Sequence, residues 1–266
     1  MKSKLRNIFS SLYILKESFK TDVKIIKKGF WNEWIDTFIW VSTTLLIAAY
    51  ILPNFGILAT YGAFMLAGVC ASVGQFETFP CVVNLVADFE GDYRTGYYLT
   101  LPYPSWTVFV RKVIYYAAIA CLLGVLVLPI GKLLLWNSFS FSQVDFVKYA
   151  AIFFTSNIFY GVLGLWTASF VPSSARLGSV WMRFVYPLWI LGCFQFSWKV
   201  LYAWSPTLAY TDLLNPITYI SEGHRAAILG DQSAINFWVC IAMVLVFSVL
   251  GCVHAVSRLR KRLDFV

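Results

Sequence analysis

The sequence has little charge: Asp, Glu, Lys and Arg make up 13% of its 266 residues, whereas hydrophobic residues make up 59%. A soluble domain of this composition could not cover its surface with polar side chains. The sequence also contains no G-x-x-x-x-G-K-[ST] phosphate loop. Its only histidines, His224 and His254, belong to no recognisable catalytic or metal-ligand arrangement. We therefore expect a membrane protein that is not an enzyme and that binds no metal or cofactor itself.

The six cysteines include no C-x-x-C pair. All six lie within apolar runs or at their edges, where a small apolar packing role is more common than a disulfide or a metal site. The sequence therefore predicts packing residues at Cys70, Cys81, Cys121, Cys193, Cys240 and Cys252.

Apolar runs recur six times along the chain, each near the length of about 20 residues that a helix needs to cross the hydrocarbon. Separate runs of this length indicate helices rather than a barrel, because helices satisfy their own backbone hydrogen bonds in lipid. The sequence thus predicts an all-α membrane protein with six spans. They are expected at 36–53, 56–80, 113–135, 146–171, 180–203 and 235–257.

The basic residues orient these spans. The net charge of +8 would suggest a nucleic-acid partner in a soluble protein, but here the positions of the charges give a different explanation. If both termini are cytoplasmic, all but four of the 21 Lys and Arg residues lie on the inner side. The exceptions are Lys132, Lys148, Lys199 and Arg225. The positive-inside rule therefore favours cytoplasmic termini, and no nucleic-acid partner is expected.

Residues 1–32 have the pattern of an amphipathic helix. Apolar residues from Leu5 to Ile26 recur at steps of three and four, and lysines occupy a neighbouring arc. Such a helix lies in the cytoplasmic membrane interface with its lysines among lipid phosphates. Two interpretations are open: a lipid anchor alone, or an anchor that is also a docking surface. The remaining residues, 33–266, form the predicted transmembrane domain.

The cytoplasmic segment between the second and third spans is unusually polar. We expect a helix over 84–101, with Leu85, Phe89, Tyr93 and Tyr97 along one apolar edge. Proline is unfavourable for the residue before it in a helix, so this segment ends before Pro102.

Its charged residues fit the same helix. Glu90 precedes Arg94 by four residues, which favours an ion pair, and Asp92 lies on a neighbouring face. Two interpretations are open: a solvated connector, or a docking helix whose apolar edge meets a partner.

A second unusual segment, 205–230, is expected on the outer side of the membrane. Ser205-Pro206 and Asn215-Pro216 each pair a preferred N-cap with proline at the first helical position. Gly230 suits the C-terminal end of the second helix. The second helix, of about 14 residues, would be only about 21 Å long, too short to cross. We therefore expect a re-entrant helical hairpin that enters the outer leaflet and returns. Glu222 and Arg225 either pair with each other or meet a polar substrate.

Both segments resemble signatures of the type-2 ABC exporter permeases. The stretch "EGDYRTGYYLTLPYPSWTVFVRKV" is similar to that family's cytoplasmic signature, although Gly91 interrupts its acidic–basic run. The matching residues are Glu90, Arg94, Gly96, Leu99, Pro102 and Lys112. The stretch "NPITYISEGHRAAILG" is similar to the second signature, before the last span. The matching residues are Asn215, Pro216, Thr218, Tyr219, Glu222, Arg225 and Gly230.

The resemblance implies the permease subunit of an exporter. Two permease copies, identical or different, would bind two cytoplasmic ATPase subunits, which hold ATP and Mg²⁺, in a bacterial inner membrane. The substrate would be a lipid-linked glycan, a lipid or an amphipathic drug. The ATPase-coupling residues would be Phe89, Glu90, Asp92, Tyr93, Arg94, Gly96, Leu99, Pro102 and Lys112. The outer gate would be Asn215, Pro216, Thr218, Tyr219, Glu222 and Arg225. The alternative is a channel or ion-translocating protein that needs no ATPase.

Overall fold

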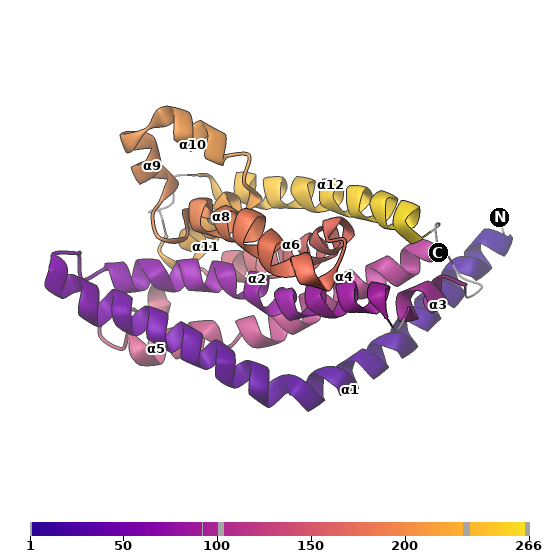
Figure 1. The fold of residues 1–266 in the computed structure, drawn as a ribbon. Coiled ribbons are helices and arrows are strands. Elements are labelled where there is room, and N and C mark those ends of the chain that lie inside the picture. Colours follow the sequence, from indigo (N-terminus) through magenta and orange to yellow (C-terminus); the bar gives the residue numbers. More distant parts are fainter. Residues whose placement is uncertain (1, 92, 101–103, 231–234, 264–266) are drawn as a thin grey trace.

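Helices make up the regular structure of the chain in the computed structural model, which describes residues 2–91, 93–100, 104–230 and 235–263 (Figure 1). Six segments are long and apolar enough to cross a membrane. The prediction of an all-α membrane protein with six spans is thereby confirmed. The segments are Ile26–Phe55, Tyr61–Glu90, Trp106–Leu134, Phe146–Phe170, Ser174–Phe194 and Phe237–Arg262.

The helices α2, α4, α11 and α12 pack around α6, and α1 contacts α2, α4 and α5. The α-helices outside the fifth span are α1 (Lys2–Leu46), α2 (Tyr61–Glu90), α3 (Arg94–Thr100), α4 (Ser105–Gly124), α5 (Val127–Leu134), α6 (Phe146–Phe170), α9 (Trp198–Trp204), α10 (Pro206–Asp212), α11 (Pro216–Ile228) and α12 (Phe237–Leu263). In Figure 1, α3 lies at the same end of the bundle as the N-terminal half of α1 and the C-terminal half of α12. The opposite end carries α5, α9 and α10.

The first span is the second half of a single long helix. α1 runs without interruption from Lys2 to Leu46, so the predicted interface helix over 1–32 joins the first span without a break. The span is completed by a π-helical turn, Ile47–Ile51, and a 3-10 turn, Leu52–Phe55.

The second span continues past its predicted end. α2 runs through Pro80 to Glu90, although proline removes one backbone hydrogen bond. Neighbouring helices make an internal proline tolerable in membrane spans. At 1.5 Å per residue, this 30-residue helix is about 45 Å long. It exceeds the hydrocarbon thickness of about 30 Å, so its last turns extend beyond the span.

The single helix predicted over 84–101 is wrong. Its first part is the end of α2, and its second part is the separate helix α3. Between them the chain turns at Gly91 and at Tyr93, whose φ of 48° is left-handed and incompatible with a continuing helix. Glu90 and Arg94 therefore do not share one helix, and the expected four-residue spacing no longer brings them together.

The fifth span is also shorter than predicted. It is a series of short helical pieces from Ser174 to Phe194, and the regular backbone breaks at Gly192 and Cys193. Cys193 has a left-handed φ of 58°. Residues 198–203, expected in this span, instead belong to α9, which leads into α10 (Figure 1).

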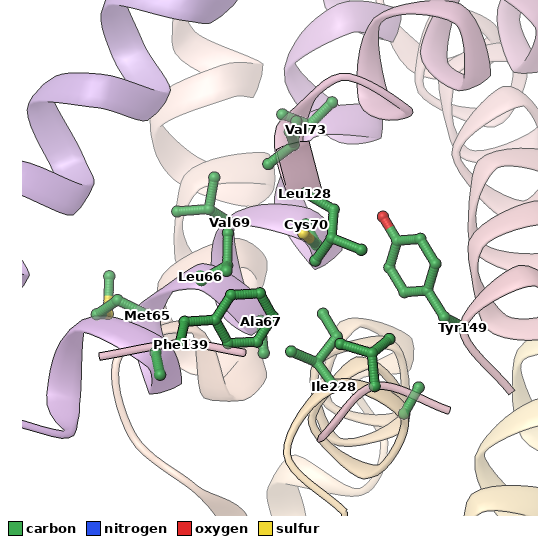
Figure 2. Packing of buried hydrophobic residues seen from close by; sticks show 14 of the residues in the cluster. Met65, Leu66, Ala67, Val69, Cys70, Val73, Leu128, Phe139, Tyr149 and Ile228 are labelled. Atoms are coloured by element: carbon green, nitrogen blue, oxygen red, sulfur yellow. The ribbon is translucent and has the colours of Figure 1, made fainter. Parts of the chain in front are cut away.

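The largest core cluster lies where α2, α5, α6 and α11 meet. Figure 2 shows Leu66 and Cys70 of α2 with Leu128 of α5, Tyr149 of α6 and Ile228 of α11. Several of these close contacts depend on glycine. A Cβ at position 68 of α2, for example, would lie 2.7 Å from the carbonyl oxygen of Phe194. The core therefore holds α2 directly against the broken end of the fifth span.

Candidate functional site

Asp88 organises the joint between α2 and α3. Its carboxylate accepts hydrogen bonds from the backbone N–H groups of Arg94 and Thr95, each at 2.9 Å. Its backbone carbonyl accepts a third, from the N–H of Tyr93, at 2.9 Å. These N–H groups belong to the start of α3 and have no partner within that short helix. Asp88 is thus an N-cap supplied by the preceding helix, and it fixes the turn.

The apolar edge predicted from Leu85 to Tyr97 has a buried part before this joint and an exposed part after it. Leu85 is 2% exposed and Phe89 is half-buried, and both pack in a core cluster with α4 and α12. Tyr93 and Tyr97 are 49% and 64% exposed. The structure therefore brings only the α3 side of this edge to the surface.

The other predicted coupling residues have separate surroundings. Glu90 accepts hydrogen bonds from the backbone N–H and the hydroxyl of Ser174, at the start of the fifth span. Leu99 packs against the core, Arg94 is exposed, and Gly96 and Lys112 are half-buried. Asp92 and Pro102 lie outside the described residues.

Two arginines attach neighbouring helices to this end of the bundle. Arg111, near the start of α4, makes a bidentate ion pair with Asp22 of α1 at 2.8 and 3.0 Å. Its guanidinium also lies 5.2 Å from the ring centre of Tyr98 in α3. Arg262 of α12 donates to the carbonyls of Val171 at 2.7 Å and of Ala168 at 3.2 Å, beyond and within the last turn of α6. These carbonyls have no further partner within α6.

At the opposite end, α11 lies inside the bundle. Asn215 is its N-cap, because its side-chain oxygen accepts from the N–H of Ile217 at 3.1 Å. Gly230, with a φ of 73°, follows its C-terminal end. Both predicted helix signals are confirmed, and the helix has 13 residues. Residues Ile217 to Ile228 are all buried against α2, α6, α12 and the fifth span.

Asn215 and the polar residues of α11 bind backbone carbonyls of the fifth span at and near its break. The amide of Asn215 donates to the carbonyl of Leu188 at 2.7 Å, and the hydroxyl of Ser221 donates to that of Gly192 at 2.7 Å. Arg225 donates to the carbonyls of Cys193 and of Phe194, the latter at 3.1 Å. Unpaired carbonyls are costly in an apolar environment, so these bonds explain how the span can break there.

Glu222 and Arg225 form an ion pair across this break. They are 3.0 Å apart and 0% and 1% exposed, so of the two interpretations the structure shows the pairing. Arg225 faces the carbonyl end of the fifth span, whereas Glu222 accepts from the first N–H of α9, that of Trp198, at 2.9 Å. Each charge therefore opposes the partial charge of the helix end that it meets. The guanidinium also lies 4.0 Å from the ring centre of Phe64 in α2.

The remaining predicted gate residues line the same cluster. Thr218 donates to the carboxylate of Asp212 at 2.8 Å, and Tyr219 packs with α6 and α12. Burial raises the pKa of Asp212 above its ordinary value, although the hydrogen bond from Thr218 opposes this shift. Pro216 begins α11. All six predicted gate residues are thus in one place, but the pair Glu222–Arg225 meets protein rather than an open surface.

Beside this cluster, an apolar groove of about 680 Å³ runs along the fifth span toward α9 and α10. Leu188, Leu191, Val200 and Trp204 contribute to its walls. Its polar lining residues are Arg183, Thr211, Asp212 and Asn215. The groove therefore suits an amphipathic molecule better than a freely soluble ion.

Some of these residues had no recognisable signal in the sequence. Asp22 and Arg262 act through partners far away in the chain, so local spacing does not reveal them. Asp88 did have a signal, because an acidic residue before a turn and a helix start is a common cap. In the described part of the chain, no group of three His, Cys, Asp or Glu side chains could hold a metal ion.

A scan against protein-family models and a search of curated proteins found no match to this chain.

Proposed function

We propose that the chain is the permease subunit of an ABC exporter. It would move a lipid-linked glycan, a lipid or an amphipathic drug outward, with ATP hydrolysed by a separate cytoplasmic subunit. The observation that carries this proposal is the α2–α3 joint. A membrane span leads through a fixed turn with the exposed Tyr93 into a capped helix whose Arg94 and Tyr97 are also exposed. A connector with no partner would not need a fixed turn or exposed aromatic residues.

The proposed motion begins at this joint. When the ATPase subunits close on ATP, they would displace α3, and the cap at Asp88 would transmit that movement to α2 as a rigid-body shift. Phe89 and Glu90, which contact the core and the fifth span, would position the joint rather than touch the partner. Tyr93 and Tyr97 would make the contact.

The groove along the fifth span supports an amphipathic substrate. Its apolar walls would accept a lipid or drug, and Arg183 together with Asp212 would accept polar groups near its ends. The cluster around α11 would be the closed outer gate, because its charged pair is fully buried in this conformation.

The assembly would contain two permease copies, identical or different, in a bacterial inner membrane with both termini cytoplasmic. The basic residues at the α3 end of the bundle support this orientation. Reporter fusions at Lys28, Gly96, Ser174 and Arg262 should then be cytoplasmic. A fusion at Gly230 should be external, and a cytoplasmic Gly230 would refute the orientation.

The test first searches the genes beside that for this chain for one that encodes a phosphate-loop ATPase without membrane spans. The two proteins are co-expressed, purified through a tag on the permease, and assayed for export and ATP hydrolysis in vesicles. Tyr97→Asp should weaken co-purification of the ATPase, because it puts a charge at the contact. The matched control is Tyr210→Asp on α10, an equally exposed tyrosine at the opposite end.

An unchanged ATPase complex with Tyr97→Asp would mean that α3 is only a connector. The absence of any ATPase partner, together with ion conduction by the chain alone in vesicles, would favour the channel instead.

A further inference from the structure

A second groove, of about 580 Å³, lies between α6, the fifth span and α12. Its walls are apolar and include Phe159, Leu163, Leu188, Phe247 and Leu250. One end is closed by Pro216 at the start of α11, and the other reaches Trp166 and His254. The groove is therefore long and apolar and lies on the wall of the bundle. It has polar groups at one end only.

That end is an aromatic and basic cluster. Trp166 donates its indole N–H to Nδ1 of His254 at 2.9 Å, which leaves the ring proton of a neutral His254 on Nε2. Phe170 packs edge-on against His254 at 5.5 Å between ring centres, and the guanidinium of Arg258 lies 4.1 Å from the centre of Phe170. The cluster joins α6 to α12.

Basic residues outnumber acidic ones around this end of the groove. None of the three helical segments that frame the groove contains Asp or Glu, whereas the fifth span carries Arg176 near its start and α12 ends in four basic residues. Glu90 reaches this end from α2, but it is bonded to Ser174. The end of the groove is therefore suited to an anion.

We propose that this groove binds a phospholipid of the surrounding membrane that has an anionic headgroup. One acyl chain lies along Phe159, Leu163 and Leu250, and the phosphate meets Nε2 of His254 and the guanidinium of Arg258. Trp and Arg side chains gather at the depth of lipid headgroups, and arginine binds phosphate through charge-assisted hydrogen bonds. The proposal rests on the six-span membrane fold and does not depend on the export function.

A second copy of the chain is a less suitable occupant. In a two-fold dimer the same surface patch of each copy meets the other. Two such patches would bring the Arg258 side chains of both copies toward each other without acidic residues on the framing helices, and like charges repel.

The experiment measures which lipids stay with the purified chain. The full chain is reconstituted in nanodiscs where anionic phospholipid is the minor component, transferred to a mild detergent, and analysed by mass spectrometry of the intact protein. The wild-type chain should retain anionic lipid in excess of its share in the bilayer. Arg258→Gln should lower this retention about tenfold, the factor for roughly 1.5 kcal/mol from one hydrogen bond to a charged group.

Two matched controls distinguish the site from general attraction. Arg260→Gln removes the same charge from the last turn of α12, outside the cluster, and should retain lipid like the wild type. Leu250→Trp should fill the groove and lower retention of all lipid. Val249→Trp, at an equally exposed position that does not line the groove, should not.

Retained lipid with the composition of the bilayer, or an equal loss with Arg260→Gln, would overturn the proposal. A disulfide between cysteines introduced at position 250 of two copies would also overturn it, because the groove would then be covered by a second chain. All variants should elute and unfold like the wild type, so that a folding defect is recognised. His254→Ala provides a second test of the headgroup contact if Arg258→Gln is unstable.

Discussion

Replacement of Arg225 by methionine should strongly destabilise the protein. The guanidinium binds two backbone carbonyls of the broken fifth span, the carboxylate of Glu222 and the face of Phe64. Methionine approximates the volume but leaves the carboxylate buried without its opposite charge. Breaking one partner out of a buried ion pair costs about 3–5 kcal/mol. We expect the free energy of unfolding to fall by about this amount.

The assay is unfolding in mixed micelles by titration with a denaturing detergent, followed by circular dichroism. Lys199→Met, on the exposed surface of α9, is the control and should stay within about 0.5 kcal/mol of the wild type. Arg225→Lys keeps the charge but not the planar guanidinium that reaches several acceptors. Its free energy of unfolding should therefore lie between those of Arg225→Met and the wild type.

A double-mutant cycle tests the cause of the loss. Adding Glu222→Gln to Arg225→Met removes the buried charge, so the double variant should be more stable than the sum of the single changes predicts, by at least about 1 kcal/mol. If Arg225→Met lowers the free energy of unfolding by less than about 1 kcal/mol, the reasoning is refuted. It would mean that water or other groups replace the guanidinium at the free carbonyls.

Three further changes test other contacts. Asp88→Ala removes the cap of α3 and should cost about 1 kcal/mol; hydrogen exchange should speed up at 93–100, and unchanged exchange would mean that the turn holds itself. Asn215→Leu removes the cap of α11 and the bond to Leu188, so export should fall more than ATP hydrolysis in reconstituted vesicles, whereas equal loss of both would indicate a damaged fold. Asp22→Asn weakens the ion pair with Arg111 and should cost about 1–2 kcal/mol, seen as faster exchange around position 22; unchanged exchange there would mean that the pair does not hold α1.

The sequence predicted the elements whose signals are local. Six apolar runs identified the spans, and Asn215-Pro216 with Gly230 identified the limits of α11, because capping depends on neighbouring residues. The break at Gly192 and Cys193 was missed because the sequence stays largely apolar through residue 203. It depends on Ser221 and Arg225, about 30 residues later, which no pattern of hydrophobicity could indicate.

The joint was only partly predicted for a related reason. The spacing of Leu85, Phe89, Tyr93 and Tyr97 fits one helix, and helical periodicity alone cannot reveal a change of direction. Gly91 was the visible signal of a turn. The role of Asp88 became clear only when its carboxylate was seen on the backbone of α3.

Because α2 is one long continuous helix, a small tilt at one end displaces the other end by several ångströms. Phe64, near one end, lies under the guanidinium of Arg225, and Asp88, near the other, holds α3. The 24 residue steps from Phe64 to Asp88 correspond to about 36 Å of helix. A tilt of about 10° around one end would displace the other by about 6 Å, with no flexible linker to absorb it. Pro80 lies between the two contacts, nearer to Asp88. It is the position at which α2 would bend first, because sharp helix kinks occur mostly at proline.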